Sequence, residues 1–236
     1  MSFSLGPYML ITIGFMLLGA LVGFILKRKF AKYAEIPSNN GMSGKEIAEK
    51  MLSDNGIYDV KVICTPGQLT DHYNPANKTV NLSEAVYNGR NAAAAAVSAH
   101  ECGHAVQHAE AYGPLNFRSK MVPLQNISGT ILNFIIMASF FGGAFLFESF
   151  PSTLVATVVL SAFGIMALFA IVTLPVEFDA SKRALAWIER SGMYTNEEYE
   201  RSKDALKWAA TTYVVAALGA LVTLLYFAMS FLGADD

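Results

Sequence analysis

Four long stretches of this sequence carry no charged side chain, at residues 1–26, 121–147, 149–176 and 208–234. Each stretch contains the roughly 20 apolar residues that an α-helix needs to cross the hydrocarbon core of a bilayer. The composition agrees, because 53% of the residues are hydrophobic, only 15% are charged, and the mean hydropathy is +0.38. We therefore predict four transmembrane helices, at about Pro7–Leu26, Ile127–Phe147, Thr153–Leu174 and Ala209–Phe231.

The basic residues predict how these helices are oriented. Four of them lie between positions 27 and 32, directly after the first apolar stretch, and none precedes it. Cytoplasmic loops carry the excess of Lys and Arg, so we expect the amino terminus outside. Residues 27–120 and 177–207, which hold all seventeen Lys and Arg, are then inside. A secretory signal has its basic residues before the apolar stretch, so the first helix is expected to be a retained anchor.

Two histidines and a glutamate stand close together in the segment Ala99–Val106. His100 and His104 are four residues apart, and Glu101 follows the first histidine directly. The preceding run of five alanines and a valine, Ala92–Val97, favours a helix, on which residues four apart share one face. Both imidazoles can then reach a single metal ion.

This HExxH pattern is typical of zinc-dependent peptidases. Neutral imidazole is a good zinc ligand, and a catalytic site with three protein ligands leaves a fourth position for water. Glu101 lies about 100° further round the helix, where it can take a proton from that water. The sequence therefore predicts His100 and His104 as zinc ligands and Glu101 as the general base.

The motif leaves the third ligand open. His108 repeats the four-residue spacing, but on a straight helix it lies about 12 Å along the axis from His100, which is too far for one ion to contact both. The other candidates for the third ligand are acidic residues at the ends of apolar helices, and Glu177 and Asp179 follow the third apolar stretch. Alternatively, they are simply the first charged residues of a helix that leaves the bilayer. Spacing alone does not decide between these two roles.

The region between the anchor and the motif predicts a small α+β part. A capping box at Ser43 and Glu46 opens a helix over 44–53. Residues 59–64 predict a strand, and 68–73 and 78–82 flank a turn signal and predict a hairpin, whose edge could pair with an extended substrate. His72 lies in this hairpin, either as a group that contacts substrate or, as we favour, as a surface or structural histidine. Further on, helices are expected over 177–190 and 196–207, and the second is expected to lead directly into the last apolar stretch.

Composition argues against several other classes of protein. A net charge of −2, with no arginine-rich block and no phosphate-binding glycine loop, argues against nucleic-acid binding. Cys64 and Cys102 both fall on the predicted cytoplasmic side, where a disulfide is not expected. The apolar stretches hold no charged residue that could line a polar path, which argues against a transporter.

Taken together, these segments resemble the YugP-type membrane zinc metallopeptidases of bacteria. The resemblance spans nearly the whole chain. Besides the leading anchor, it is carried by four segments, Asp71–Tyr73, Lys78–Ser83, His100–Gln107 and Pro175–Ser181. More distantly, the chain is similar to the HtpX-type membrane endopeptidases, in which HExxH supplies two ligands and a later ExxxD supplies the third.

The resemblance implies a ligand set for zinc. Carried over by position, it assigns His100, His104 and Glu177 as a gluzincin-like set of ligands and Glu101 as the base. Ser181 stands where the HtpX pattern has the aspartate that orients a ligand. The resemblance therefore implies that Asp179 or Ser181 shares this positioning role.

We therefore expect a mainly α integral membrane protein with four transmembrane helices and a cytoplasmic, α+β, zincin-like metallopeptidase domain that contains a small β-sheet. Its predicted segments are an N-terminal transmembrane anchor (1–29), a cytoplasmic part with the HExxH helix (30–125), a transmembrane hairpin (126–175), cytoplasmic helices with the third ligand (176–207) and a C-terminal transmembrane helix (208–236).

The expected function is zinc-dependent hydrolysis of peptide bonds at the cytoplasmic surface of a bacterial plasma membrane. Its partners would be the lipid bilayer and peptide or protein substrates, including membrane proteins. The alternative is a zinc-binding membrane scaffold or partner-regulating protein without turnover, although a purely structural zinc site needs no base. Small residues permit close helix contacts within one chain, with a second copy or with another membrane protein, namely Gly19, Gly23, Gly142, Gly143 and Gly219.

Overall fold

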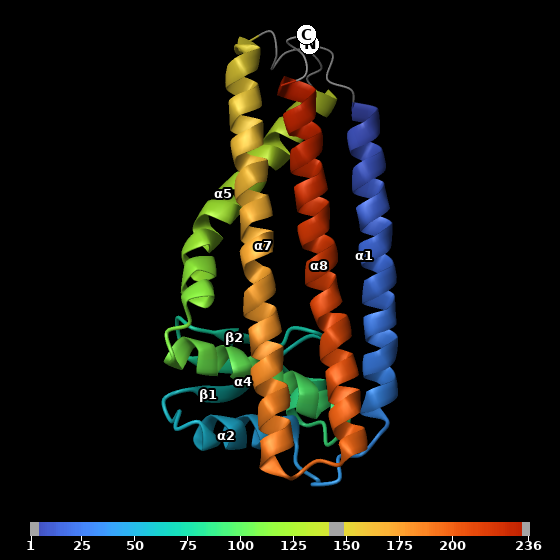
Figure 1. Cartoon of the computed structure of the whole chain (residues 1–236), viewed down its shortest axis with the longest axis vertical. Coiled ribbons are helices and arrows are strands. Elements are labelled where there is room, and N and C mark those ends of the chain that lie inside the picture. Colours follow the sequence, from blue (N-terminus) through green and yellow to red (C-terminus); the bar gives the residue numbers. More distant parts are fainter. Residues whose placement is uncertain (1–4, 142–148, 233–236) are drawn as a thin grey trace. The chain divides into compact units, whose positions relative to one another are not determined.

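The computed structural model describes residues 5–141 and 149–232 of the chain. It is mainly helical with one small sheet, as the sequence predicts (Figure 1). The elements are α1 (Leu5–Ala34), α2 (Gly44–Asp54), β1 (Lys61–Thr65), β2 (His72–Asn74), β3 (Thr79–Ser83), α3 (Glu84–Tyr87), α4 (Ala92–Ala109), α5 (Gly113–Phe141), α7 (Ser152–Ser191) and α8 (Asn196–Leu232).

By packing, the chain forms two compact units. Unit 1 comprises residues 1–20, 117–174 and 213–236, and unit 2 comprises residues 21–116 and 175–212. The five segments predicted from the sequence stay a prediction, because this division groups residues by their contacts and not by their side of a membrane.

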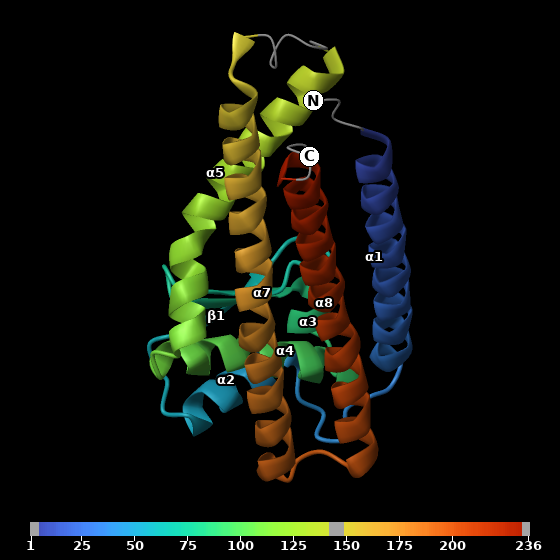
Figure 2. The same cartoon turned by 45° about the horizontal axis from the view of Figure 1, so that its top comes forward.

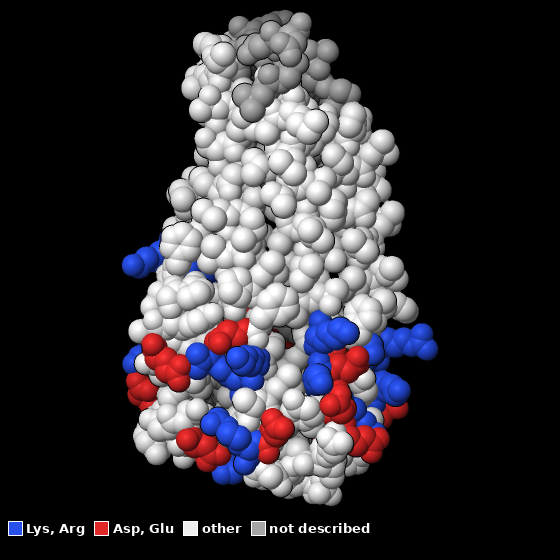
Figure 3. All heavy atoms as spheres, viewed as in Figure 1, with Lys and Arg blue, Asp and Glu red and all other residues white. Residues whose placement is uncertain are grey.

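Unit 1 has the composition of a protein part that faces lipid. Its described residues include only two charged side chains, Arg118 and Lys120. Large apolar side chains are exposed on its surface, among them Leu10, Leu17, Phe134 and Met229. In Figure 3 the charged side chains gather over unit 2, and most of the rest of that face carries none. An exposed apolar surface of this extent would be costly in water, so these residues fit a bilayer.

Within the described residues, four helices are long and apolar enough to cross a membrane, which agrees with the predicted number. They are Gly6–Ala34, Gly113–Ser139, Thr153–Ser191 and Asn196–Phe231. The predicted end of the second span, Phe147, lies outside the described residues.

The third of these long helices, α7, runs further than the sequence predicts. We expected the third span to end at Leu174 and a new helix to begin at Glu177, but α7 continues through Pro175. A proline inside a helix loses one backbone hydrogen bond and costs about 3 kcal/mol. The turns that follow remain helical because Val176, Ala180 and Ala184, spaced four residues apart, are all buried. The predicted helix over 196–207 leads directly into the last span, as expected, so that α8 is one continuous helix.

The small sheet of unit 2 has the strand order β1-β3-β2. β2 and β3 form the predicted antiparallel hairpin, with His72 opposite Asn81 and Asn74 opposite Thr79, but residues 68–71 of the expected first strand lie outside β2. β1 pairs with β3 in parallel, which the sequence pattern did not predict. β2 is therefore an edge strand, while β3 lies in the centre with all five residues buried.

The core of unit 2 is built around α4, which packs between α2 and the strands β2 and β3 (Figure 1, Figure 2). The predicted capping box is present, since the Ser43 and Glu46 side chains each bond the other's backbone N–H. α2 then buries Ile47 and Met51 against the alanine-rich face of α4. Burial of a side chain of this size contributes about 1.5–3 kcal/mol, so this helix stabilises the core of unit 2 by packing.

The backbones of α4 and α7 approach each other very closely at Gly103. A Cβ atom placed on Gly103 would lie 2.5 Å from the carbonyl oxygen of Ala180. Only glycine leaves room for that contact, and Ala180 comes three residues after Glu177 on α7. The close crossing thus determines how near this part of α7 comes to α4.

Replacing Gly103 by alanine is expected to destabilise the protein by about 1–3 kcal/mol, because one of the two backbones must move to admit the methyl group. The thermal midpoint in detergent micelles checks this. Gly164→Ala is the matched control, since nothing lies within 4 Å of a Cβ at that position on α7. Equal midpoints for the two variants would contradict a tight crossing.

The glycines of the apolar helices differ in how closely other residues surround them. A Cβ on Gly219 would lie 3.2 Å from the Phe15 ring, so this glycine serves a contact between α8 and α1 within one chain. Gly19 and Gly23 have nothing within 4 Å of such a Cβ. Gly142 and Gly143 lie outside the described residues. Association with a second copy or with another membrane protein stays a prediction.

Candidate metal centre

α4 is the helix that the alanine run predicts. It begins after Asn91, whose side chain accepts a hydrogen bond from the Ala94 N–H and caps the first turn. It ends where Ala111 adopts a φ of 53° and the Tyr112 N–H bonds back to the Gln107 carbonyl. His100 and His104 lie one turn apart in its middle, so they share a face.

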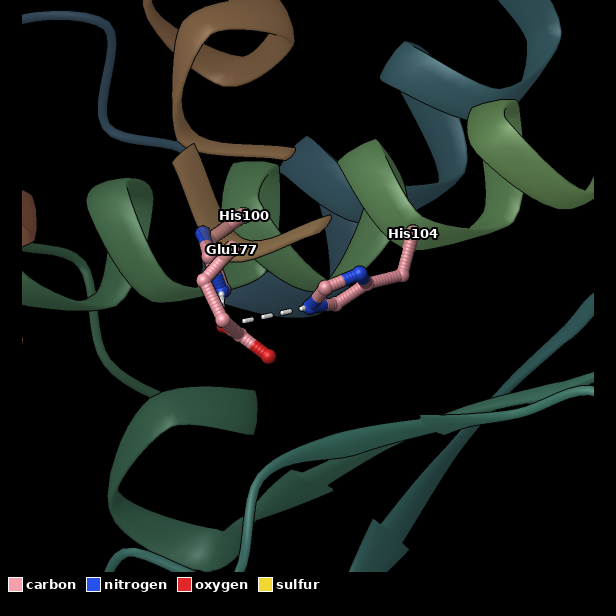
Figure 4. A group of neighbouring side chains, drawn as sticks. All are labelled: His100, His104 and Glu177. Atoms are coloured by element: carbon pink, nitrogen blue, oxygen red, sulfur yellow. Dashed lines mark hydrogen bonds and ion pairs between the residues drawn. The ribbon is translucent and has the colours of Figure 1, made fainter. Parts of the chain in front are cut away.

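The side chain of Glu177 on α7 completes a group of three with these histidines. Its Oε2 lies 3.3 Å from Nε2 of His100 and 3.6 Å from Nε2 of His104. One ligand atom from each residue lies within 4.8 Å of the other two. Figure 4 shows the three side chains pointing toward one another, two from α4 and one from α7. Of the two acidic residues that spacing left open, the structure brings Glu177 into the group.

This arrangement fits zinc. Four ligands at about 2.0–2.1 Å in a tetrahedron are separated from one another by about 3.3–3.4 Å. The two N–O separations are close to that value and longer than an ordinary hydrogen bond of about 2.7–3.2 Å. Three ligands of the types N, N and O leave one tetrahedral position open, which is the pattern of catalytic zinc sites.

The outer ring nitrogen of each histidine has its own partner. Nδ1 of His100 lies 3.1 Å from Oγ of Ser181, and Nδ1 of His104 lies 3.0 Å from Oε1 of Gln107. Both Nε2 atoms are thereby left to face Glu177. Ser181 thus contacts a histidine of the group directly, at the position where the HtpX pattern has an aspartate.

Gln107 is the residue that sequence reasoning missed. Its side chain is fully buried, and its Nε2 donates to the Val176 carbonyl at 2.8 Å and to Oδ2 of Asp179 at 2.9 Å. Asp179 therefore contacts the group through Gln107. A signal existed in the sequence, because an amide three residues after His104, on the same helix face, stands out among alanine and valine.

Burial and charge shape the site. Glu177 is 2% exposed and Glu101 is 8% exposed. Burial lowers the pKa of His104, but the carboxylates of Glu177 and Glu101 raise it, and the pKa lies above its ordinary value. A negative charge at Glu101 therefore acts on the site even though Glu101 is not one of the three clustered residues. Such a concentration of negative charge attracts a cation.

The other two histidines lie apart from this group. His72 is exposed, and its Nδ1 donates to the Thr70 carbonyl at 2.7 Å. His108 shares a 2.7 Å hydrogen bond through Nδ1 with the hydroxyl of Tyr73, whose pKa burial raises to about 12. This contact joins α4 to the edge strand β2. Both cysteines are free, Cys64 exposed and Cys102 buried.

Two comparisons with known proteins agree on the family of this chain. Residues 8–232 match the family described as "Putative neutral zinc metallopeptidase". The chain belongs to this family. It is also 39% identical over 229 residues to the "Putative membrane protease YugP" of Bacillus subtilis (strain 168), covering 97% of this chain and 98% of that protein. No solved structure matches the chain.

Proposed function

We propose that this protein is a membrane zinc metalloendopeptidase whose active site consists of His100, His104 and Glu177 as ligands and Glu101 as the base. The observation that supports this most is the convergence of one carboxylate oxygen and two imidazole nitrogens, in which both nitrogen–oxygen separations are close to those expected around zinc. The family and the similarity to a membrane protease agree with it.

The chemistry divides between the metal and Glu101. When bound, zinc would polarise the peptide carbonyl and lower the pKa of a water molecule toward about 7. The Glu101 carboxylate accepts the proton of the attacking water and then donates it to the nitrogen of the leaving amine. The burial of Glu101 shields this carboxylate from bulk solvent. His100, His104 and Glu177 would hold the zinc ion. Gln107 and Ser181 contact the outer nitrogens of the two histidines and so orient their rings.

The edge strand β2 is the surface on which we propose that substrate binds. It has one pairing partner, β3, and its middle residue, Tyr73, ties it to α4 through the contact with His108. An extended peptide can add to such an edge by backbone hydrogen bonds. The distribution of Lys and Arg supports a site that faces the cytoplasm of a bacterial cell, next to the plasma membrane.

A metal-removal experiment tests this function. The purified full-length protein in detergent micelles is expected to cleave an unstructured protein such as casein, to lose that activity after dialysis against a zinc chelator, and to regain it with one equivalent of zinc. Magnesium should not restore it, because two imidazoles and one carboxylate are a poor ligand set for a hard, octahedral cation. Casein cleavage that survives complete removal of zinc would contradict a metallopeptidase. Stoichiometric zinc binding without cleavage of any unstructured substrate would favour the scaffold.

A further inference from the structure

Besides the proposed ligands, one fully buried amide connects both helices of the metal centre. Gln107 lies on α4 three residues after His104, and it contacts α7 at Val176 and Asp179, which lie one position before and two positions after Glu177. We infer that Gln107 is a positioning residue, which sets the ring orientation and tautomer of His104 so that its Nε2 carries the lone pair toward the metal. This inference rests on the proposed function, because it requires His104 to be a zinc ligand.

The orientation of the Gln107 amide follows from its partners. Its nitrogen faces two groups that can only accept a hydrogen bond, the Val176 carbonyl and the Asp179 carboxylate. If the amide were turned over, its oxygen would face both of those oxygens and would repel them. The oxygen of Gln107 must therefore face His104, and a carbonyl oxygen can only accept, so Nδ1 of His104 carries the proton. The neutral imidazole then has its lone pair on Nε2.

The Asp179 carboxylate is itself fixed from the other side. Nε of Arg183 donates to the same Oδ2 at 2.5 Å, and Nη1 of Arg183 donates to Oε2 of Glu110 at 2.6 Å. The chain of contacts therefore runs from Glu110 at the end of α4, through α7, and back to His104 in α4. A chain of this kind restricts the rotation of the amide more than either of its two acceptors could alone. Asp179 therefore helps to orient His104 indirectly, by fixing the amide of Gln107.

His100 differs from His104 in this respect. The Ser181 hydroxyl that lies beside its Nδ1 can both donate and accept, so it does not impose one tautomer. The tautomer of His104 is therefore the one that the fold determines on its own, and the expected effect of losing Gln107 is concentrated on that ligand.

The test measures the zinc dissociation constant of the full-length protein in micelles, by competition with a chromophoric chelator. Gln107→Met has nearly the same length but neither accepts from Nδ1 nor donates to Val176. Loss of a residue that orients a ligand typically costs about 10–100-fold in metal affinity, and we expect a loss in that range for this variant. Trp187→Phe is the matched control, because it removes a hydrogen bond of another buried side chain of unit 2, and that bond runs from Nε1 to Asp54 and not to a histidine. Its zinc affinity should equal that of the unchanged protein.

A second pair of variants separates positioning from general packing. Asp179→Asn keeps an oxygen that can accept from both Gln107 and Arg183, whereas Asp179→Leu has a similar size and accepts from neither. Both variants remove the same charge and neither changes Gln107 or His104, so the difference between them measures the orientation of the Gln107 amide. We expect Asp179→Asn to bind zinc roughly two- to tenfold more tightly than Asp179→Leu.

The outcomes are distinguishable. Equal zinc affinity for Gln107→Met and the unchanged protein, or equal zinc affinity for Asp179→Asn and Asp179→Leu, would overturn the positioning role while leaving the proposed ligands intact. Failure of the unchanged protein to bind one zinc ion would instead overturn the proposed function, and this inference with it. If Gln107→Met does not fold, Asp179→Ala, at a half-buried position, should still show a smaller loss of zinc affinity in the same direction. An unchanged affinity in that variant would contradict the inference.

Discussion

Replacing Glu101 by glutamine is expected to lower the rate of peptide hydrolysis by about 10²–10⁴-fold while the protein keeps its zinc. Glutamine has the shape of glutamate but cannot accept a proton from water near neutral pH. Glu101 is not among the three residues whose ligand atoms converge, so its replacement leaves the proposed ligand set intact. The measurement is casein cleavage at saturating zinc, with bound zinc determined on the same sample.

Glu84→Gln is the matched control for this prediction. Glu84 is exposed in the first turn of α3 and belongs to none of the contacts described for the site, so this variant should cleave at the original rate. A Glu101→Gln protein that keeps both its zinc and its full activity would exclude Glu101 as the base. Because the inactive variant should still bind substrate, it also offers a way to capture what the protein cleaves in its native membrane.

Replacing Glu177 by alanine is expected to weaken zinc binding by roughly 10²–10³-fold. Protein zinc sites bind with about 10–16 kcal/mol, which is roughly 2.5–4 kcal/mol for each of four ligands. The substitution also leaves the two histidines without the carboxylate that lies between them. Activity at limiting zinc should fall in parallel. The zinc dissociation constant and the zinc dependence of casein cleavage together check this prediction.

The comparison for Glu177→Ala is Glu189→Ala, an exposed glutamate twelve positions later on the same helix. The control should bind zinc as the unchanged protein does. If the two variants bind zinc equally, the third ligand is another residue. The contact of Glu177 with the two histidines in Figure 4 would then serve only to pack α7 against α4.

The sequence predicts those parts of the site that depend on short spacings. His100 and His104 are one helical turn apart, and an alanine run and an asparagine cap are enough to make that turn helical. Glu177 is 73 positions after His104, and its arrival beside the histidines depends on how α7 packs on α4. Spacing left it open, and only resemblance to a family suggested it. Gln107 was missed because its role depends on partners in α7.

The same distinction applies to the fold. Apolar length predicts four candidate spans, the capping box predicts α2, and the turn residues predict the hairpin but not the shortness of its first strand. The parallel pairing of β1 with β3 joins strands separated by another strand, which no local pattern encodes. The length of α7 was underestimated because Pro175 normally ends a helix, whereas here the buried residues after it keep the helix continuous.

The close crossing at Gly103 has a consequence for how related proteins vary. Any side chain at this position would push against the main chain of the neighbouring helix, so substitutions there cannot be absorbed by a change of rotamer. We therefore expect relatives with this geometry to share HExGH and not merely HExxH. The residue at position 180 can vary as long as the backbone of α7 keeps its place beside α4. A search for distant relatives should be more selective when it requires that glycine.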